Sequence, residues 1–203
     1  MISMLYEKRE LFEKIEIKIG DAVSPLPVTP NQWTLISVLL GIASMLLVIE
    51  GIFYWAVLLF LLSALCDWLN GIVARKRNFY TKAFRYLDTM ADRYVDGMIL
   101  FGMLFMSLPV IIFPGYVWIF IALFGSLATA FAKAAAKEKE MVSSEMRRGL
   151  VTRPERIILL SVALLLADSN IALTAYVLIF VAVMSNLTAL QRIWSAIKIN
   201  KNN

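Results

Sequence analysis

The chain has 203 residues, of which 60% are hydrophobic, and it carries a net charge of +5 and a mean hydropathy of +0.74. This apolar share exceeds that of a soluble domain and predicts an integral membrane protein. One Cys and no His exclude an internal disulfide, a His-based catalytic triad and a zinc site of His or several Cys ligands. Anionic headgroups or phosphorylated substrates account for the positive charge, so we expect no nucleic acid partner.

Charges interrupt every apolar run in the first 20 residues, which excludes a signal peptide. Apolar side chains recur there near helical spacing, with Lys and Glu opposite, at Leu5, Phe12, Ile15 and Ile19. This pattern predicts an amphipathic helix lying in the membrane interface. Three prolines between residues 25 and 30 separate it from the first apolar stretch.

Six apolar stretches follow, which cover residues 33–53, 54–74, 87–108, 112–136, 156–170 and 171–193. A membrane-spanning helix needs about 20 residues. We therefore predict an all-α membrane fold of six transmembrane helices plus the N-terminal interfacial helix, forming one domain over residues 1–203. With six spans, all Lys and Arg residues fall on one side of the membrane. The positive-inside rule makes that side cytoplasmic and places both termini there, in the cell membrane.

Polar residues interrupt the second and third spans at helical spacing. One face of the second span carries Asp67, Asn70, Gly71 and Ala74, and one face of the third carries Asp88, Asp92 and Asp96. Carboxylates in a membrane are costly unless cations lie among them. Oxygen ligands without thiol or imidazole suit Mg²⁺ or Mn²⁺. Two roles remain open for Asp96: it supports this metal site, or it forms a structural ion pair.

Six of these residues, at fixed spacing, resemble the signature of the CDP-alcohol phosphatidyltransferase family: Asp67, Gly71, Ala74, Arg75, Asp88 and Asp92. The six spans, the cytoplasmic termini and the amphipathic N-terminal helix are similar to that family too. Two positions depart from the signature. Asn70 stands where the family has its second Asp, and Phe84 stands where it has Gly.

The resemblance implies a metal-dependent enzyme in which an acceptor hydroxyl attacks the β-phosphorus of a CDP-alcohol and CMP leaves. The implied metal ligands are Asp67, Asn70, Asp88 and Asp92, with Asp92 also the base. The implied ions are Mg²⁺ or Mn²⁺, two in number, or one if Asn70 weakens the second site. The implied CDP pocket comprises Asn31, Thr34, Gly71, Ala74 and Arg75. The family also implies a homodimer.

Three basic residues resemble the inositol-phosphate-accepting branch of the family and would bind the acceptor phosphate: Lys133, Arg153 and Arg192. Within this branch, myo-inositol 1-phosphate is the expected acceptor, and glycerol 3-phosphate is the alternative that a cationic pocket also suits. The lipid donor is expected to be CDP-diacylglycerol or CDP-archaeol. Arg156 is expected to pair with Glu155 or with lipid headgroups.

Three other interpretations remain. The carboxylates of the second and third spans would form only structural ion pairs with Arg75, Arg85 and Arg93. Alternatively, Asn70 and Phe84 would mark a catalytically impaired relative that binds nucleotide or metal. An ion transporter would need polar groups running toward the outer side, and Glu50 and Asp168 are too isolated to provide them.

Overall fold

The computed structural model describes residues 16–142 and 149–201. A helix over residues 16–23 precedes α2 Pro30–Ile49, α3 Phe53–Lys76, α4 Lys82–Met103, α5 Gly115–Glu138, α6 Arg153–Leu166 and α7 Ile171–Lys201. The regular elements of the described residues are helices, so the predicted all-α class is confirmed. Residues 1–15, with three of the apolar positions of the predicted interfacial helix, and residues 143–148 of the basic loop lie outside the described residues.

Four helices of the described residues are long and apolar enough to cross a membrane, namely α2, α3, α5 and α7. The other two differ for separate reasons. α6 has 14 residues, which at a rise of 1.5 Å per residue span only about 21 Å. α4 has 22 residues, and its first four turns contain the acidic and basic residues of the third predicted span. The structure therefore supports four spans by length and composition.

The chain divides into two compact units, and the first comprises residues 1–40 and 62–94. In this unit the helix over residues 16–23 packs closely on α3, because a Cβ added to Gly20 would lie 3.1 Å from Ile72 Cγ2. Arg77 at the end of α3 donates hydrogen bonds to three backbone carbonyls of the segment that leads into α2, at 3.1 Å to Ser24, 2.5 Å to Leu26 and 2.8 Å to Val28. These bonds fix the start of α2 relative to the end of α3.

Phe84 in the first turn of α4 is buried, with 2% of its surface exposed. Its ring packs against Phe79 and Tyr80, with centroids 6.0 Å apart in each pair. Aromatic pairs at this separation stabilise beyond simple burial of area. The large side chain at this position therefore holds the turn between α3 and α4.

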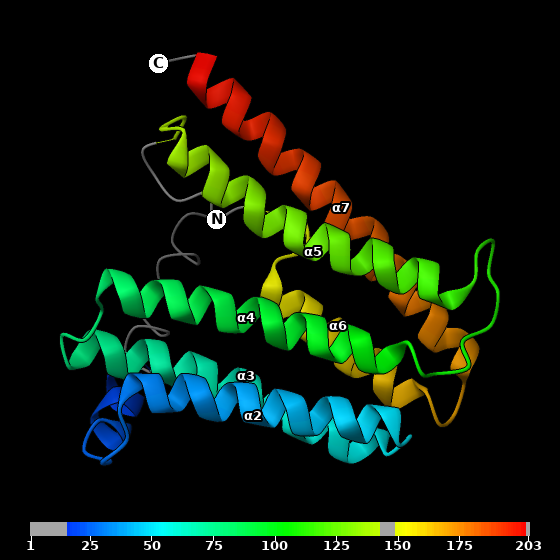
Figure 1. Ribbon diagram of the computed structural model, residues 1–203, viewed down its shortest axis with the longest axis horizontal. Helices are drawn as coiled ribbons and strands as arrows, with labels where there is room; N and C mark the ends of the chain where they lie inside the picture. Colours follow the sequence, from blue (N-terminus) through cyan, green and yellow to red (C-terminus); the bar gives the residue numbers. More distant parts are fainter. Residues whose placement is uncertain (1–15, 143–148, 202–203) are drawn as a thin grey trace, which may run out of the picture. The chain divides into compact units, whose positions relative to one another are not determined.

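The second unit comprises residues 41–61 and 95–203 and contains α5, α6 and α7. α5 and α7 lie side by side, and α6 packs on α7 (Figure 1). Close approach of α5 to α7 requires Gly125, where an added Cβ would lie 2.5 Å from Asn186 Nδ2. Gly41 likewise packs against Val95 of α4, with an added Cβ 3.0 Å from Val95 Cγ2. Small residues thus set the helix packing, as is usual in membrane bundles.

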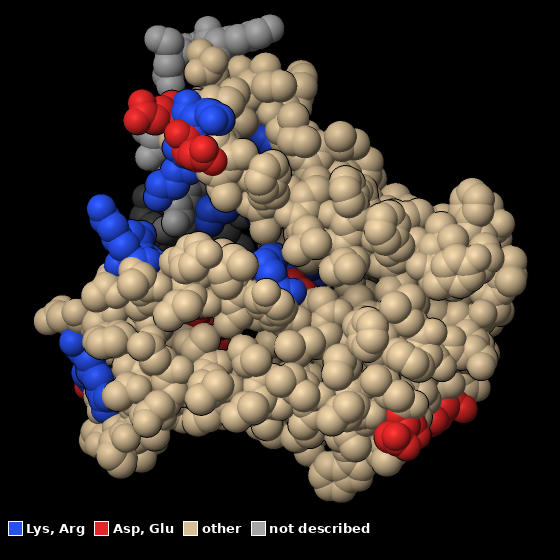
Figure 2. Space-filling model, in the orientation of Figure 1, with Lys and Arg blue, Asp and Glu red and all other residues tan. Residues whose placement is uncertain are grey.

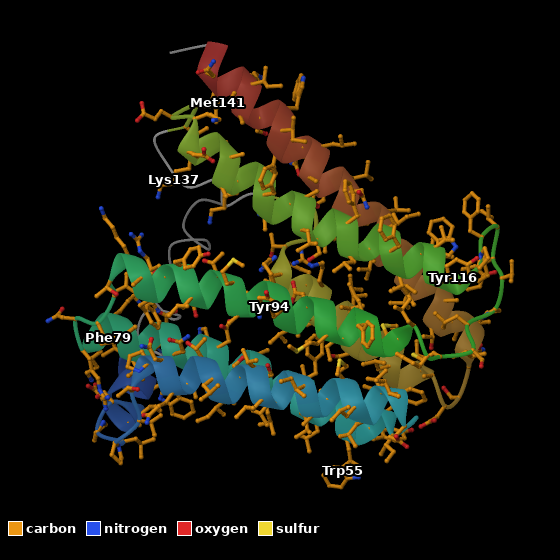
Figure 3. The ribbon with its side chains drawn as sticks, viewed as in Figure 1. Trp55, Phe79, Tyr94, Tyr116, Lys137 and Met141 are labelled. Carbon is orange, nitrogen blue, oxygen red and sulfur yellow. The ribbon has the colours of Figure 1, made fainter. Side chains whose placement is uncertain are left out.

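Large apolar side chains are exposed on every membrane-length helix. On the face in Figure 2, Lys, Arg, Asp and Glu gather in a few small groups and leave most of the surface uncharged. Figure 3 shows the exposed Tyr116 at the opposite end of α5 from Lys137 and Met141. Aromatic residues at one helix end and cations at the other are typical of membrane-water interfaces.

Candidate functional site

The start of α2 is built by a reciprocal pair of hydrogen bonds. The backbone N–H of Thr29 donates to Gln32 Oε1 at 2.7 Å, and the backbone N–H of Gln32 donates to Thr29 Oγ1 at 3.4 Å. This is a capping box, with Pro30 at the first helical position, where its missing N–H costs nothing. The cap places Asn31 and Thr34 in the first turns of α2, and Thr34 Oγ1 donates to the carbonyl of Pro30 at 3.2 Å.

Asn70 joins three helices of the first unit through its carboxamide. Its Nδ2 donates to Thr34 Oγ1 of α2 at 2.9 Å and to Asp88 Oδ1 of α4 at 2.6 Å. The residue is completely buried, and its Oδ1 accepts no hydrogen bond from the described part of the chain. A buried carbonyl oxygen that accepts no hydrogen bond is unusual, because buried polar groups are nearly always hydrogen-bonded.

This oxygen fits a divalent cation. Mg²⁺ and Mn²⁺ prefer carboxylate and carbonyl oxygens, and Asn70 offers one beside Asp88. Asp67 lies one turn before Asn70 on α3, and Asp92 lies one turn after Asp88 on α4, where its Oδ2 is 3.6 Å from Arg93 Nη2. Among the described residues no three His, Cys, Asp or Glu side chains gather closely enough to hold a metal on their own. The structure therefore joins Asn70 to Asp88, and the full set of four ligands stays a prediction.

The predicted CDP-pocket residues of α3 lie in different surroundings. An added Cβ at Gly71 would meet no atom within 4 Å, so the helix is open there. Ala74 is fully buried. The side chain of Arg75 is 51% exposed, and its Nη2 lies 3.0 Å from Glu16 Oε2. Arg75 thus pairs with the helix over residues 16–23. The interpretation of the carboxylates as structural ion pairs had instead paired Arg75 with a carboxylate of the second or third span.

A cavity of about 490 Å³ lies beside this ion pair. Its walls come from the helix over residues 16–23 and from the last turns of α3; they are Glu16, Ile17, Gly20, Asp21, Ile72, Arg75 and Lys76. Lys76 pairs with Asp21 across the same space. The lining of the cavity therefore combines apolar groups with two cations, each of which is paired with a carboxylate.

The predicted acceptor residues all lie in the second unit. Arg192 of α7 donates from Nη1 to the backbone carbonyl of Thr129 at 3.0 Å, and Lys133 follows Thr129 by one turn of α5. The segment before α6 is anchored to the same part of α7, because the backbone N–H of Val151 donates to Thr188 Oγ1 at 3.0 Å. The structure thus brings Arg192 to the turn of α5 that runs from Thr129 to Lys133.

Arg153 begins α6, after a capping box of Thr152 and Glu155. Arg153 Nε lies 3.4 Å from Asp96 Oδ1 on α4. From the sequence alone, two roles remained open for Asp96, namely support of the metal site and a structural ion pair.

Arg156 lies elsewhere than the sequence predicts. The sequence predicted a pair with Glu155 or with lipid headgroups, whereas Arg156 is 3% exposed and its Nη2 donates to Asp96 Oδ2 at 2.8 Å. The reason is helical spacing, because residues three apart share a face and Arg156 follows Arg153 onto the buried side of α6. That spacing was the available signal, but nothing local indicated which carboxylate would meet it.

Apolar helices and a buried polar group that joins α2, α3 and α4 define an integral membrane protein with a candidate metal site. The family model of the CDP-alcohol phosphatidyltransferases matches residues 27–196, and the chain belongs to this family.

Two curated relatives illustrate its range. The archaetidylinositol phosphate synthase of Pyrococcus horikoshii is 30% identical over 185 residues, which cover 89% of this chain and 90% of that protein. The bifunctional IPC transferase and DIPP synthase of Aquifex aeolicus is 33% identical over 153 residues, or 71% of this chain. The match covers 35% of that bifunctional protein, so this chain spans about a third of its length.

A solved structure has the same fold. The phosphatidylinositol phosphate synthase of Mycobacterium tuberculosis with CDP-DAG bound superposes with a TM-score of 0.75 at 24% identity, over 90% of this chain and 94% of that chain. Its complex with manganese and citrate gives a TM-score of 0.75 at 23% identity, over 89% and 88%.

Proposed function

We propose that the chain transfers the phosphatidyl-type group of a CDP-alcohol to myo-inositol 1-phosphate and releases CMP. The donor is CDP-diacylglycerol or CDP-archaeol. The observation that carries the proposal is the buried carboxamide of Asn70, which joins Thr34 and Asp88 and keeps one oxygen for a cation. Family membership supports the reaction class, and the names of the relatives support an inositol phosphate as the acceptor.

In this proposal Asp67, Asn70, Asp88 and Asp92 hold one or two divalent ions. The M. tuberculosis enzyme in complex with manganese supports a divalent metal. When bound, the ions neutralise the pyrophosphate and stabilise the charge on the departing CMP. Asp92 accepts the proton of the acceptor hydroxyl. At the same time the hydroxyl oxygen forms a bond to the β-phosphorus, and the bond between that phosphorus and CMP breaks.

The donor nucleotide occupies the first unit, against Asn31, Thr34, Gly71, Ala74 and Arg75. The open side of Gly71 supports this assignment, because a substrate can approach the backbone there. The exposed guanidinium of Arg75 would exchange Glu16 for a phosphate of the donor. The structure of the M. tuberculosis enzyme with CDP-DAG bound supports a CDP-lipid as donor.

The acceptor phosphate is bound in the second unit by Lys133, Arg153 and Arg192. Arginine supplies paired donors to phosphate and lysine a point charge. The contact of Arg192 with Thr129, one turn from Lys133, supports the convergence of two of them. Glycerol 3-phosphate carries the same charged group, so acceptor choice depends on the remaining hydroxyls.

For the topology we propose six spans within one domain over residues 1–203, with α4 and the short α6 as the additional spans. Basic residues end α3 and α5, and aromatic residues begin them, which supports a cytoplasmic active site and cytoplasmic termini. The proposed assembly is a homodimer, as in the family.

The test is CMP release by the purified protein with a CDP-lipid, Mg²⁺ and one acceptor at a time. Release with inositol 1-phosphate, and not with inositol or serine, supports the proposal. Release with glycerol 3-phosphate alone would assign the other acceptor. Failure with every acceptor, together with activity in the Asn70→Asp variant, would show a catalytically impaired relative.

A further inference from the structure

The segment that leads into α6 is docked on a single threonine of α7. The backbone N–H of Val151 donates to Thr188 Oγ1 at 3.0 Å. Two residues earlier, Gly149 packs on the methyl group of the same side chain, because an added Cβ would lie 2.7 Å from Thr188 Cγ2. Thr188 therefore holds this segment through both its hydroxyl and its methyl group.

The hydroxyl of Thr188 is oriented for this role. Thr188 is fully buried, and its Oγ1 donates to the backbone carbonyl of Met184, one turn earlier on α7, at 2.7 Å. A hydroxyl has one hydrogen to donate and lone pairs with which to accept, so the N–H of Val151 meets the accepting side of Oγ1. Val151 is itself buried, and a buried N–H that loses its partner is costly. The hydrogen bond therefore fixes the segment at one position along α7.

Two arginines of the predicted acceptor site lie next to this dock. Arg192 follows Thr188 by one turn of α7, and its Nη2 would lie 3.7 Å from a Cβ added to Gly149. Arg153 begins α6 two residues after Val151, and two residues of chain extend over about 7 Å at most. The dock therefore determines how close Arg153 can lie to Arg192.

The close approach at Gly149 occurs beside the guanidinium group of Arg192, and this favours a positioning role over a simple loop anchor. Carbon atoms in ordinary contact are about 3.5–4.0 Å apart, so a side chain at residue 149 would push the segment from α7 by about 1 Å. Surface connections generally tolerate changes of this size. A site that binds one phosphate with several cations must instead be held to within about 0.5 Å.

We propose that Gly149 and Thr188 are positioning residues of the acceptor site: they hold the segment before α6 against α7, and so place Arg153 beside Arg192 for binding of one phosphate. This inference rests on the proposed function, because it takes both arginines as residues that bind the acceptor phosphate. Neither Gly149 nor Thr188 needs to contact a substrate in this role.

The contact predicts an unusual pattern of variants. In Gly149→Ala, the new Cβ overlaps the Cγ2 atom of Thr188, and the segment moves away from α7. Thr188→Ser removes that methyl group and keeps the hydroxyl, and the next atoms around the added Cβ are 3.7 Å away. The double variant Gly149→Ala, Thr188→Ser should therefore bind the acceptor better than Gly149→Ala alone, which is the opposite of additive damage.

The experiment measures CMP release at saturating CDP-lipid with inositol 1-phosphate varied, and then the reverse. Gly149→Ala should raise the acceptor KM at least about tenfold and leave the donor KM within about twofold, since a misplacement of about 1 Å can cost up to ~100-fold. The double variant should recover most of this loss. Thr188→Val keeps the volume of the side chain but removes the hydroxyl, so it should also raise the acceptor KM, whereas Thr188→Ser alone should stay close to the wild type.

Gly115→Ala is the matched control. Its added Cβ would lie 2.5 Å from Leu108 Cβ, at the opposite end of α5 from Lys133, so it introduces the same kind of clash away from the acceptor residues. It should lower the Tm and leave the acceptor KM unchanged. A rise in acceptor KM equal to that of Gly149→Ala would show general destabilisation and overturn the inference.

An unchanged acceptor KM in Gly149→Ala would also overturn the inference, as would an equal rise in both KM values or a double variant no better than the single one. If Gly149→Ala does not fold, Thr188→Val beside Thr188→Ser carries the same comparison. The inference then requires a higher acceptor KM in Thr188→Val only.

Calorimetric binding of inorganic phosphate separates this inference from the proposed function. Weaker phosphate binding by Gly149→Ala that the double variant restores, in a protein that shows no turnover, would support the positioning role and contradict the function. Equal phosphate binding by Gly149→Ala and the wild type would overturn the positioning role.

Discussion

The hydrogen bond from Asn70 to Asp88 makes Asn70→Asp an informative substitution, because it adds a charge with little change in side-chain shape. Asn70 Nδ2 lies 2.6 Å from Asp88 Oδ1 and 2.9 Å from Thr34 Oγ1. In the variant a carboxylate oxygen replaces the donating nitrogen. The contact with Asp88 then joins two anions at a position that is fully buried.

Two charges ~4 Å apart repel by about 4 kcal/mol at an effective dielectric constant of about 20. For a chain of this length each kcal/mol corresponds to roughly 2–4 °C in Tm. We therefore expect the Tm of the variant in detergent with EDTA to fall by about 10 °C. A divalent cation among the carboxylates removes the repulsion, so Mg²⁺ or Mn²⁺ should raise the Tm of the variant more than that of the wild type.

The assay is thermal unfolding followed by intrinsic fluorescence at neutral pH, with EDTA and across a Mg²⁺ titration. Asn78→Asp is the matched control, since it makes the same chemical change in the exposed turn after α3. Its Tm should stay within about 2 °C of the wild type, as is usual for surface changes. This view of the site is refuted if the Asn70→Asp variant has the same Tm as the wild type in EDTA. It is also refuted if Mg²⁺ raises the Tm of the variant no more than that of the wild type.

Three other outcomes follow from individual contacts. Phe84→Ala should lower the free energy of unfolding by about 3–5 kcal/mol, because it empties a buried aromatic site; a smaller loss on thermal unfolding would show that the turn does not depend on this ring. Gly125→Ala places a Cβ 2.9 Å from the backbone nitrogen of Asn186 and should cost about 1–3 kcal/mol. Gly97→Ala, where the nearest atom is 3.8 Å away, is its control, and equal melting of the two would contradict the packing argument. Asp92→Ala should abolish CMP release without a large loss of Tm, and substantial remaining activity would remove Asp92 as the base.

The sequence predicted the helices well, because apolar runs and their polar breaks are local features. The predicted stretch 54–74 corresponds to α3 Phe53–Lys76, and 112–136 corresponds to α5 Gly115–Glu138. It predicted the third stretch less well, since α4 Lys82–Met103 begins five residues before residue 87. Thr81 explains this early start, as its Oγ1 accepts the backbone N–H of Phe84 at 3.1 Å and caps the helix.

What the sequence by itself determined is the set of residues on each helix face, because the helical period places Asp67 with Asn70 and Asp88 with Asp92 whatever the rest of the chain does. Only the tertiary structure decided their partners across helices. It joined Asn70 to Thr34 and Asp88, and it buried Arg156 against Asp96, 60 residues away in sequence. The physical reason is that spacing along one helix is fixed by local backbone geometry, whereas contact between helices depends on how all of their side chains pack.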